Sequence, residues 1–213
     1  MTTAITGRII RGDPCVAEGA AWLANRDPRF GAALATLGPL PLRLRDDGFP
    51  ALVSAICGQQ VSVASANAIF ARLDDAGMTD PRSVASASEE ELRALGLSRP
   101  KARYVKALAA ADIDYAALRT LPTDNVIATL VAVPGIGIWT AEIYAMFSLG
   151  RADVIAPADL ALQEGARLLF DLPARPTDRA LRAMAEDWSP WRSVAARLLW
   201  AYYAMHKQRE GIR

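Results

Sequence analysis

A short turn, Val133-Pro134-Gly135-Ile136-Gly137, carries the most informative chemistry in the chain. Pro134 is expected to end one helix, and the two glycines widen the range of conformations that the turn can adopt. A second helix is expected to begin near Thr140 and Ala141, and the first amides of a helix lack intrahelical partners. Such amides can bind a phosphate oxygen at the positive end of the helix. The turn therefore predicts contact with a nucleic-acid backbone, whatever the base sequence.

Asp159 is a second candidate, because it stands at the expected start of a helix in Ala156-Pro157-Ala158-Asp159. The positive end of a helix favours an ionised carboxylate. Taken alone, this position predicts an N-cap, whose side chain accepts hydrogen bonds from backbone amides. An ionised carboxylate can also stabilise positive charge that develops on a substrate. The two roles are compatible, and the position by itself favours the cap.

Side chains that bind metals are few. Cys15 and Cys57 are the only cysteines, and His206 is the only histidine. This composition excludes a four-cysteine iron–sulfur cluster and argues against a zinc site. Both cysteines are expected to be small apolar residues in a reducing compartment, and His206 is expected to be exposed rather than catalytic.

Charge is segregated along the chain, although the formal net charge is only +1. Basic residues gather in 92–106 and 188–213, and acidic residues gather in 74–91. Such a pattern would give one basic and one acidic face, as in proteins that bind nucleic acids. Charge alone favours the simpler alternative, which is solvated helix surface. No apolar run has transmembrane length and no signal sequence begins the chain, so a soluble, intracellular protein is expected.

Helical spacing of apolar residues and scarce strand-type alternation predict an all-α protein. Its 213 residues suffice for one or two compact domains. Ser88 and Glu91 predict a capping box at the start of one helix. The expected helices cover about 13–25, 27–37, 49–57, 61–76, a short helix from 80, another from 88, 99–111, 123–132, 139–149, 159–170, one from 176, and 189–207.

Four segments in this order resemble the helix-hairpin-helix (HhH-GPD) DNA glycosylase superfamily, and within it the bacterial 3-methyladenine DNA glycosylase II enzymes. A hairpin alone occurs in many DNA-binding proteins that are not enzymes, but four elements in one order are far more specific. The segments are the turn with Trp139-Thr140-Ala141 (the hairpin), Ile155-Ala156-Pro157-Ala158-Asp159 (the loop of the catalytic aspartate), Ile56-Cys57-Gly58-Gln59-Gln60-Val61-Ser62 (the loop that enters the minor groove), and Trp188-Ser189-Pro190-Trp191-Arg192-Ser193 followed by Trp200 (the C-terminal helix).

The resemblance implies two helical lobes with the active site in a cleft between them. One lobe would contain residues 43–146 with the hairpin, and the other would contain residues 1–42 and 147–213. The extra N-terminal sheet domain of the glycosylase II enzymes is expected to be absent. The resemblance also implies a sodium or potassium ion bound by main-chain carbonyls, with no other cofactor required and no iron–sulfur cluster. These carbonyls would belong to Val131, Val133 and Gly135.

Three features depart from the family's patterns. Bifunctional members carry a lysine in the hairpin that forms a Schiff base, and Trp139 stands at that position here. A tryptophan cannot attack the sugar, so a monofunctional enzyme is expected. Besides the absent sheet domain, three positions that carry pocket aromatics in the glycosylase II enzymes are occupied here by Ile143, Leu160 and Ala201.

Under the resemblance, Asp159 is the catalytic residue, stabilising positive charge on the sugar as the N-glycosidic bond breaks. Trp139 and Trp200 are expected to line a pocket for a flipped base, because electron-rich rings attract a cationic alkylated purine. Weaker candidates for the pocket are Ile143, Tyr144, Leu160 and Tyr203, whereas Trp191 is expected in the core. Candidates for DNA contact are Gln59, Gln60, Val61, Lys101, Gly135, Ile136, Gly137 and Thr140.

Two of these roles have evenly matched alternatives. Gln60 would fill the gap left by the flipped nucleotide while Gln59 supports the loop, or both amides would simply satisfy a break in a helix. Lys101 would contact a phosphate or lie on a solvated helix face.

The predicted function is a monofunctional DNA glycosylase of base excision repair that removes alkylated bases, chiefly 3-methyladenine-like purines, and leaves an abasic site. Its expected partner is damaged double-stranded DNA, bound by a monomer in the bacterial cytoplasm at the nucleoid. The alternatives are a non-catalytic helix-hairpin-helix DNA-binding protein and a helical interaction protein that has lost DNA contact. Asp159 and Trp139 at the family's spacing favour the enzyme.

Overall fold

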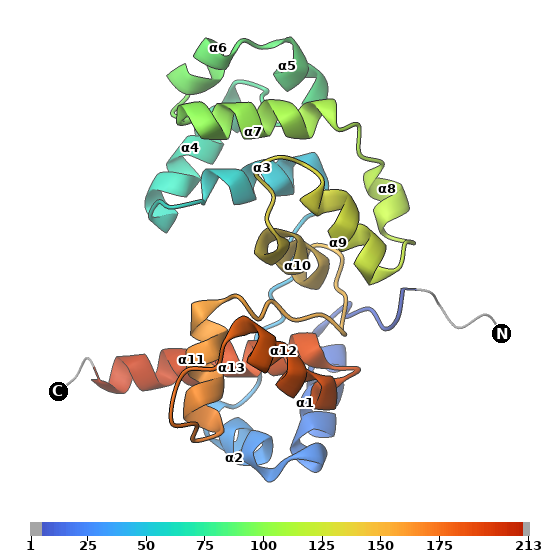
Figure 1. Ribbon diagram of the computed structural model, residues 1–213, viewed down its shortest axis with the longest axis vertical. Helices are drawn as coiled ribbons and strands as arrows, with labels where there is room; N and C mark the ends of the chain where they lie inside the picture. The colour runs from blue at the N-terminus through green and yellow to red at the C-terminus, as the bar shows by residue number, and fades with distance from the viewer. Residues whose placement is uncertain (1–5, 211–213) are drawn as a thin grey trace. The chain divides into compact units, whose positions relative to one another are not determined.

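A computed structural model describes residues 6–210, with side chains as far as residue 208. Figure 1 shows a helical protein, and the described residues contain no strand beyond an isolated antiparallel bridge between Ile9 and Arg151. The predicted all-α class is therefore confirmed. None of the described helices is long and apolar enough to cross a membrane.

Contacts divide the chain into two compact units. The first comprises Met1–Leu44 and Ala145–Arg213, and the second comprises Arg45–Tyr144. The sequence had placed these divisions at 42/43 and 146/147, two residues away in each case.

The second unit begins with helices whose starts are well specified by sequence. Proline in the first turn of a helix removes an amide that would have no partner, as at Pro50, Pro81 and Pro100. The predicted capping box of Ser88 and Glu91 is present. The helices are α3 (Phe49–Cys57), α4 (Val63–Asp75), α5 (Pro81–Ser86), α6 (Glu89–Ala94), α7 (Arg99–Ala110), α8 (Tyr115–Leu118) and α9 (Thr123–Val131), followed by the first residues of α10 (Ile138–Phe147).

Helix α7 organises the packing of this unit, since it contacts α3, α5 and α6. Its buried face carries Val105 and Leu108, whereas its other faces carry most of the basic residues. Leu52, Val53 and Ile56 of α3 are completely buried. This packing fixes the end of α3, from which the Gly58–Ser62 loop emerges.

The first unit is built around α13 (Arg192–Glu210), which packs on α1 (Asp13–Arg26), α2 (Pro28–Leu37) and α11 (Leu160–Leu169). The helices α11 and α13 approach closely at Gly165, because an added Cβ there would lie 2.4 Å from the carbonyl oxygen of Leu199. The unit also contains α12 (Asp178–Met184) and the 3-10 helix η1 (Ala185–Trp188).

Most expected helices are found within two residues of their predicted ends, and the exceptions are short or irregular. Helix α13 begins at Arg192 rather than at Ser189, because η1 and a turn precede it. Neither α8 nor η1 was predicted, because four residues are too few to show helical periodicity. Trp191 is buried, as predicted.

Candidate active site and nucleic-acid interface

Asp159 is held at the start of α11 by three hydrogen bonds to one carboxylate oxygen. Its Oδ1 accepts from the amides of Ala161 and Leu162 at 2.9 and 3.0 Å. The indole Nε1 of Trp200 donates to the same oxygen at 3.1 Å. The expected N-cap is therefore present, and the cap also fixes the carboxylate beside an aromatic ring.

Trp200 is brought to Asp159 by α13, 41 residues further along the chain. The Phe147 ring lies 5.7 Å from the Trp200 ring, and the Arg43 guanidinium lies 5.8 Å from the Trp200 ring centre. Trp200 is only partly buried. The structure thus unites two of the predicted site residues and adds a cation that the sequence analysis did not foresee.

Arg43 owes its place to Arg197, which was also missed. The Arg197 side chain is completely buried, and its Nε and Nη2 donate to the Leu42 carbonyl at 3.0 and 2.8 Å. Arg43, the next residue, adopts a left-handed backbone with φ of 55°. Burial, with a smaller contribution from Arg43, lowers the pKa of Arg197 to about 10. The guanidinium remains charged at neutral pH and ties the Leu42 segment to α13.

The hairpin between α9 and α10 turns at Gly135, whose φ is +92°. An added Cβ there would lie 2.2 Å from Cγ of Tyr104 on α7, so both the conformation and the contact require glycine. Gly137 has an ordinary φ, and nothing lies within 4 Å of an added Cβ. The expectation that both glycines relieve steric limits is therefore correct for Gly135 alone. Ile136 and Thr140 have buried side chains, so only their main chain could contact DNA.

The loop after α3 is attached to this hairpin. The side chain of Gln59 donates from Nε2 to the Gly135 carbonyl at 2.8 Å. Gln60 is exposed and adopts a left-handed backbone with φ of 56°, which is uncommon for a residue with a side chain. Val61 and Val63 follow with 42 and 76% of their surface exposed. Gln59 thus supports the loop, and the residues after it project an amide and two apolar side chains.

The structure corrects the prediction for Lys101. Its side chain is only 8% exposed, and its Nζ donates to the carbonyl of Cys57, the last residue of α3, at 2.8 Å. A helix end lacks intrahelical donors for its last carbonyls, and a lysine can supply one. Lys101 therefore caps α3 from within the unit, rather than contacting a phosphate or lying on a solvated face.

Tyr144 is also placed differently from the prediction of a pocket wall. It is 4% exposed, and its hydroxyl accepts a hydrogen bond from the Gly48 amide at 2.9 Å. Burial raises the pKa of Tyr144 to about 12. Trp139 and Leu160, by contrast, have 42 and 60% of their surface exposed. Tyr144 therefore belongs to the packing of the second unit.

Comparison with known proteins decides the family. Residues 53–190, more than half of the chain, match the HhH-GPD superfamily of base excision DNA repair proteins. The chain belongs to this superfamily. The predicted resemblance is confirmed, and the match includes the loop after α3, the hairpin and Asp159.

Individual relatives agree with this assignment. The DNA-3-methyladenine glycosylase 2 of Escherichia coli is 34% identical over 168 residues, which cover 72% of this chain and 57% of the relative. A DNA-3-methyladenine glycosidase from Bacillus halodurans has a TM-score of 0.79 and 31% identity, covering 87% of this chain and 88% of that chain. The 3-methyladenine DNA glycosylase of Schizosaccharomyces pombe, solved with abasic DNA, has a TM-score of 0.74 and 29% identity, covering 86 and 95% of the two chains.

Two of the hairpin carbonyls that were predicted to bind a cation also accept hydrogen bonds. The Val133 carbonyl accepts from the Ile136 amide at 3.1 Å, and the Gly135 carbonyl accepts from Gln59 at 2.8 Å. A carbonyl oxygen has two lone pairs, so each retains one that could face a cation. Among the described residues, no group of three or more His, Cys, Asp or Glu side chains could hold a metal ion.

Proposed function

We propose that this HhH-GPD protein is a monofunctional DNA glycosylase that hydrolyses the bond between an alkylated base and its deoxyribose. Its substrates are chiefly 3-methyladenine-like purines in double-stranded DNA, and its product is an abasic site. The observation that carries the proposal is the Asp159 carboxylate, whose Oδ1 is fixed by two amides and the Trp200 indole. The names of the relatives support the same reaction and the same lesion class.

Binding begins at the hairpin. The amides at the start of α10 bind phosphate oxygens of the DNA, because a helix N-terminus has unsatisfied donors and a partial positive charge. A sodium or potassium ion on the carbonyls of Val131, Val133 and Gly135 would add positive charge there. Gln60, exposed on a loop that Gln59 fastens to the hairpin, enters the duplex where the nucleotide has been flipped out.

The reaction breaks the bond between C1′ and the base nitrogen. Positive charge develops on the sugar as this bond breaks, and the Asp159 carboxylate stabilises it. Water then forms the new C1′–O bond and gives up a proton to Asp159 or to solvent, while the bonding electrons leave with the base. An alkylated purine that already carries a positive charge leaves as a neutral molecule, so no strong general acid is required.

Trp139 accounts for the monofunctional outcome. Its indole stands where bifunctional relatives have a lysine, and it cannot form a Schiff base with the sugar. Its role as a ring that contacts the base stays a prediction, and its half-exposed side chain is consistent with that role. Trp200 offers a second aromatic face beside Asp159.

The test measures base release from alkylated duplex DNA by the wild-type protein and by Asp159→Asn. Asparagine also serves well as an N-cap, so this change removes the charge while largely preserving the start of α11. Freed bases are identified chromatographically, and abasic sites are counted as strand breaks after alkali. We expect 3-methyladenine from the wild-type protein and at most a few per cent of that rate from the variant.

Asp171→Asn is the matched control. Asp171 is exposed in the same unit and adopts a left-handed backbone with φ of 51°, which asparagine tolerates. It should leave base release unchanged. If the wild-type protein binds DNA but releases no more base than Asp159→Asn, the proposed activity is wrong and a non-catalytic DNA-binding protein remains.

A further inference from the structure

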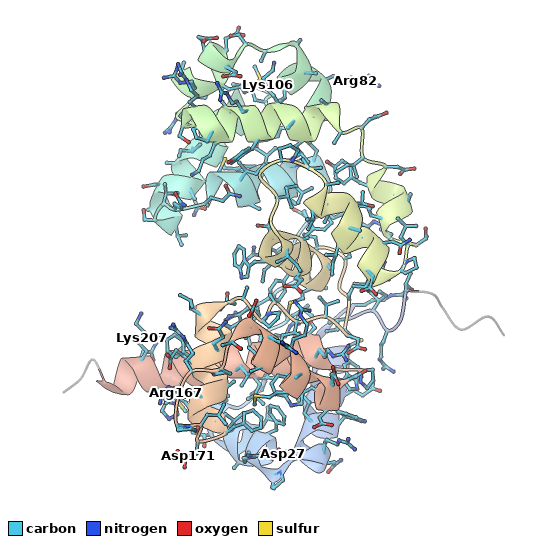
Figure 2. All side chains as sticks on the ribbon, in the orientation of Figure 1. Asp27, Arg82, Lys106, Arg167, Asp171 and Lys207 are labelled. Carbon is cyan, nitrogen blue, oxygen red and sulfur yellow. The ribbon has the colours of Figure 1, made fainter. Side chains whose placement is uncertain are left out.

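A basic groove lies between α11 and α13 in the first unit. It has a volume of about 490 Å³ and is open to solvent. Figure 2 labels Arg167 on α11 and Lys207 on α13, the two helices that form its sides. Arg175, on the loop after α11, also lines it. The groove begins at Leu160 and Ala161, directly after Asp159.

The groove carries more positive than negative charge. Among the described residues that line the groove, Arg167, Arg175 and Lys207 are cations and Glu164 is the one carboxylate. Glu164 accepts from Arg167 at 2.7 Å and lies 3.8 Å from Arg175. One carboxylate thus lies near two guanidinium groups and holds them close to each other. Such a site selects an anionic ligand with oxygen acceptors that face two donors at once.

The remaining lining suits a ligand that is more than a small anion. Leu160 and Tyr203 contribute apolar and aromatic surface, which a sugar or base edge can cover. The volume exceeds what one phosphate group needs, so a single inorganic ion would leave most of the groove empty. Alternating anionic and less polar surface is characteristic of a nucleic-acid strand.

The position of the groove relative to Asp159 limits which part of a strand could lie in it. Leu160 and Ala161 at its near end follow the carboxylate directly, and Tyr203 is one helical turn beyond Trp200. Arg167 lies about 12 Å further along α11 than Asp159, at 1.5 Å per residue. A strand whose sugar stands at Asp159 would reach these cations within a few nucleotides.

We propose that this groove binds phosphodiester groups of the damaged strand, a few nucleotides from the excised base. The proposal rests on the function proposed above and adds a second backbone site, separate from the hairpin. Arg175 and Lys207 contact the phosphates, and Glu164 keeps Arg175 and Arg167 oriented toward them. The groove thereby holds the damaged strand in register with the Asp159 carboxylate.

The first experiment measures the salt dependence of binding to a duplex that contains a tetrahydrofuran abasic analogue. Each phosphate that a protein neutralises adds about 0.9 to the slope of log affinity against log salt. The double variant Arg175→Gln/Lys207→Gln should therefore bind more weakly, with a slope reduced by about 1–2. Both side chains are exposed, so the variant should unfold at the wild-type temperature.

Arg11→Gln/Arg82→Gln is the matched control, because it removes the same charge at exposed positions outside the groove lining. It should leave the slope unchanged. A wild-type slope in the groove variant, or an equal fall in the control, would overturn the proposal and leave only general attraction between charges.

The second experiment locates the contact on the DNA. Single phosphates of either strand are replaced by neutral methylphosphonates, and the affinity of each duplex is measured. Neutral groups a few nucleotides to one side of the abasic analogue, on the damaged strand, should weaken binding by the wild-type protein several-fold and leave the groove variant unaffected. Equal losses of affinity in both proteins, or losses confined to the opposite strand, would refute the proposal that the groove binds the damaged strand. Base release by the wild-type protein in any of these cases would leave the proposed glycosylase activity intact.

Discussion

Replacement of the two hairpin glycines separates a structural requirement from a binding requirement. Gly135→Ala places a methyl group 2.2 Å from Cγ of Tyr104, at a backbone φ of +92°. Gly137→Ala adds the same methyl group to an ordinary backbone, with nothing within 4 Å of it. The two changes are chemically identical and lie two residues apart, so each controls for the other.

The expected loss of stability follows from these geometries. Left-handed backbone costs a residue with a Cβ about 1–2 kcal/mol, and overpacking against a packed neighbour, here the half-buried Tyr104, typically costs a further 1–3 kcal/mol. Gly135→Ala should therefore lose roughly 2–5 kcal/mol of unfolding free energy, which lowers the melting temperature by about 4–20 °C for a chain of this size. Gly137→Ala should stay within about 0.5 kcal/mol of the wild-type protein.

For Gly137→Ala we expect DNA affinity to fall although the stability of the protein is unchanged. If a phosphate oxygen approaches the main chain at Gly137, the added methyl group obstructs it in the folded protein. Loss of one charge-assisted hydrogen bond of about 1.5–3 kcal/mol would weaken binding roughly 10- to 150-fold. Gly137→Ala should thus bind abasic duplex poorly while it melts normally, as measured by calorimetric melting and fluorescence anisotropy.

A rescue variant tests the steric part of the argument. Tyr104→Gly removes both the ring and the Cβ of Tyr104, which the Gly135→Ala methyl group would meet at 2.2 and 2.6 Å. In a double-mutant cycle the two changes should be less than additive by about 1–3 kcal/mol, leaving the backbone cost in place. Additive effects, or a Gly137→Ala protein as unstable as Gly135→Ala, would refute the reading of this turn.

Three further outcomes are expected. Lys101→Met should lower the free energy of unfolding by about 1–3 kcal/mol, because the Cys57 carbonyl loses its donor. The same change should leave the salt slope of DNA binding unchanged, and a slope reduced by about 1 would show that Lys101 does contact a phosphate. Gln59→Leu should weaken DNA binding without unfolding the chain, since it frees the loop from Gly135, and wild-type affinity would contradict this coupling. Borohydride should trap no protein–DNA adduct, because Trp139 offers no amine, and a band of adduct on a denaturing gel would disprove the monofunctional assignment.

The fold was largely predictable because capping residues and prolines mark the starts of many of its helices in the local sequence. Ser88 and Asp159 cap helices as predicted, Asp80 caps the helix that was expected to begin there, and the prolines that follow Asp27 and Asp80 lie in first helical turns. These signals act within four residues and need no tertiary information. The start of α13 was misplaced because Ser189-Pro190 has the composition of a helix start, whereas the chain makes one more turn before Arg192.

The site was predicted less completely, because burial decides the role of a polar side chain and a single sequence does not show burial. Lys101 lies on a basic helix, a position that predicts an exposed charge. Its side chain is instead buried in the second unit and donates to the Cys57 carbonyl. Tyr144 reads as a pocket aromatic, but its hydroxyl accepts a hydrogen bond inside the unit. A helical-wheel comparison of Lys101 with Val105 and Leu108, which share its buried face, could have signalled the first case.

Arg43 weakens the inference that the aromatic ring of Trp200 selects a positively charged base. An electron-rich ring attracts a cationic base through its face, and this attraction supported a preference for alkylated purines. The Arg43 guanidinium already lies 5.8 Å from the centre of the Trp200 ring, held there by Arg197 through the Leu42 carbonyl. A second cation brought to the same ring is repelled by the first, so Trp200 alone attracts a charged base less than an unaccompanied indole would. The ease with which a charged base leaves, together with Asp159, is then the stronger physical reason for an alkylated substrate.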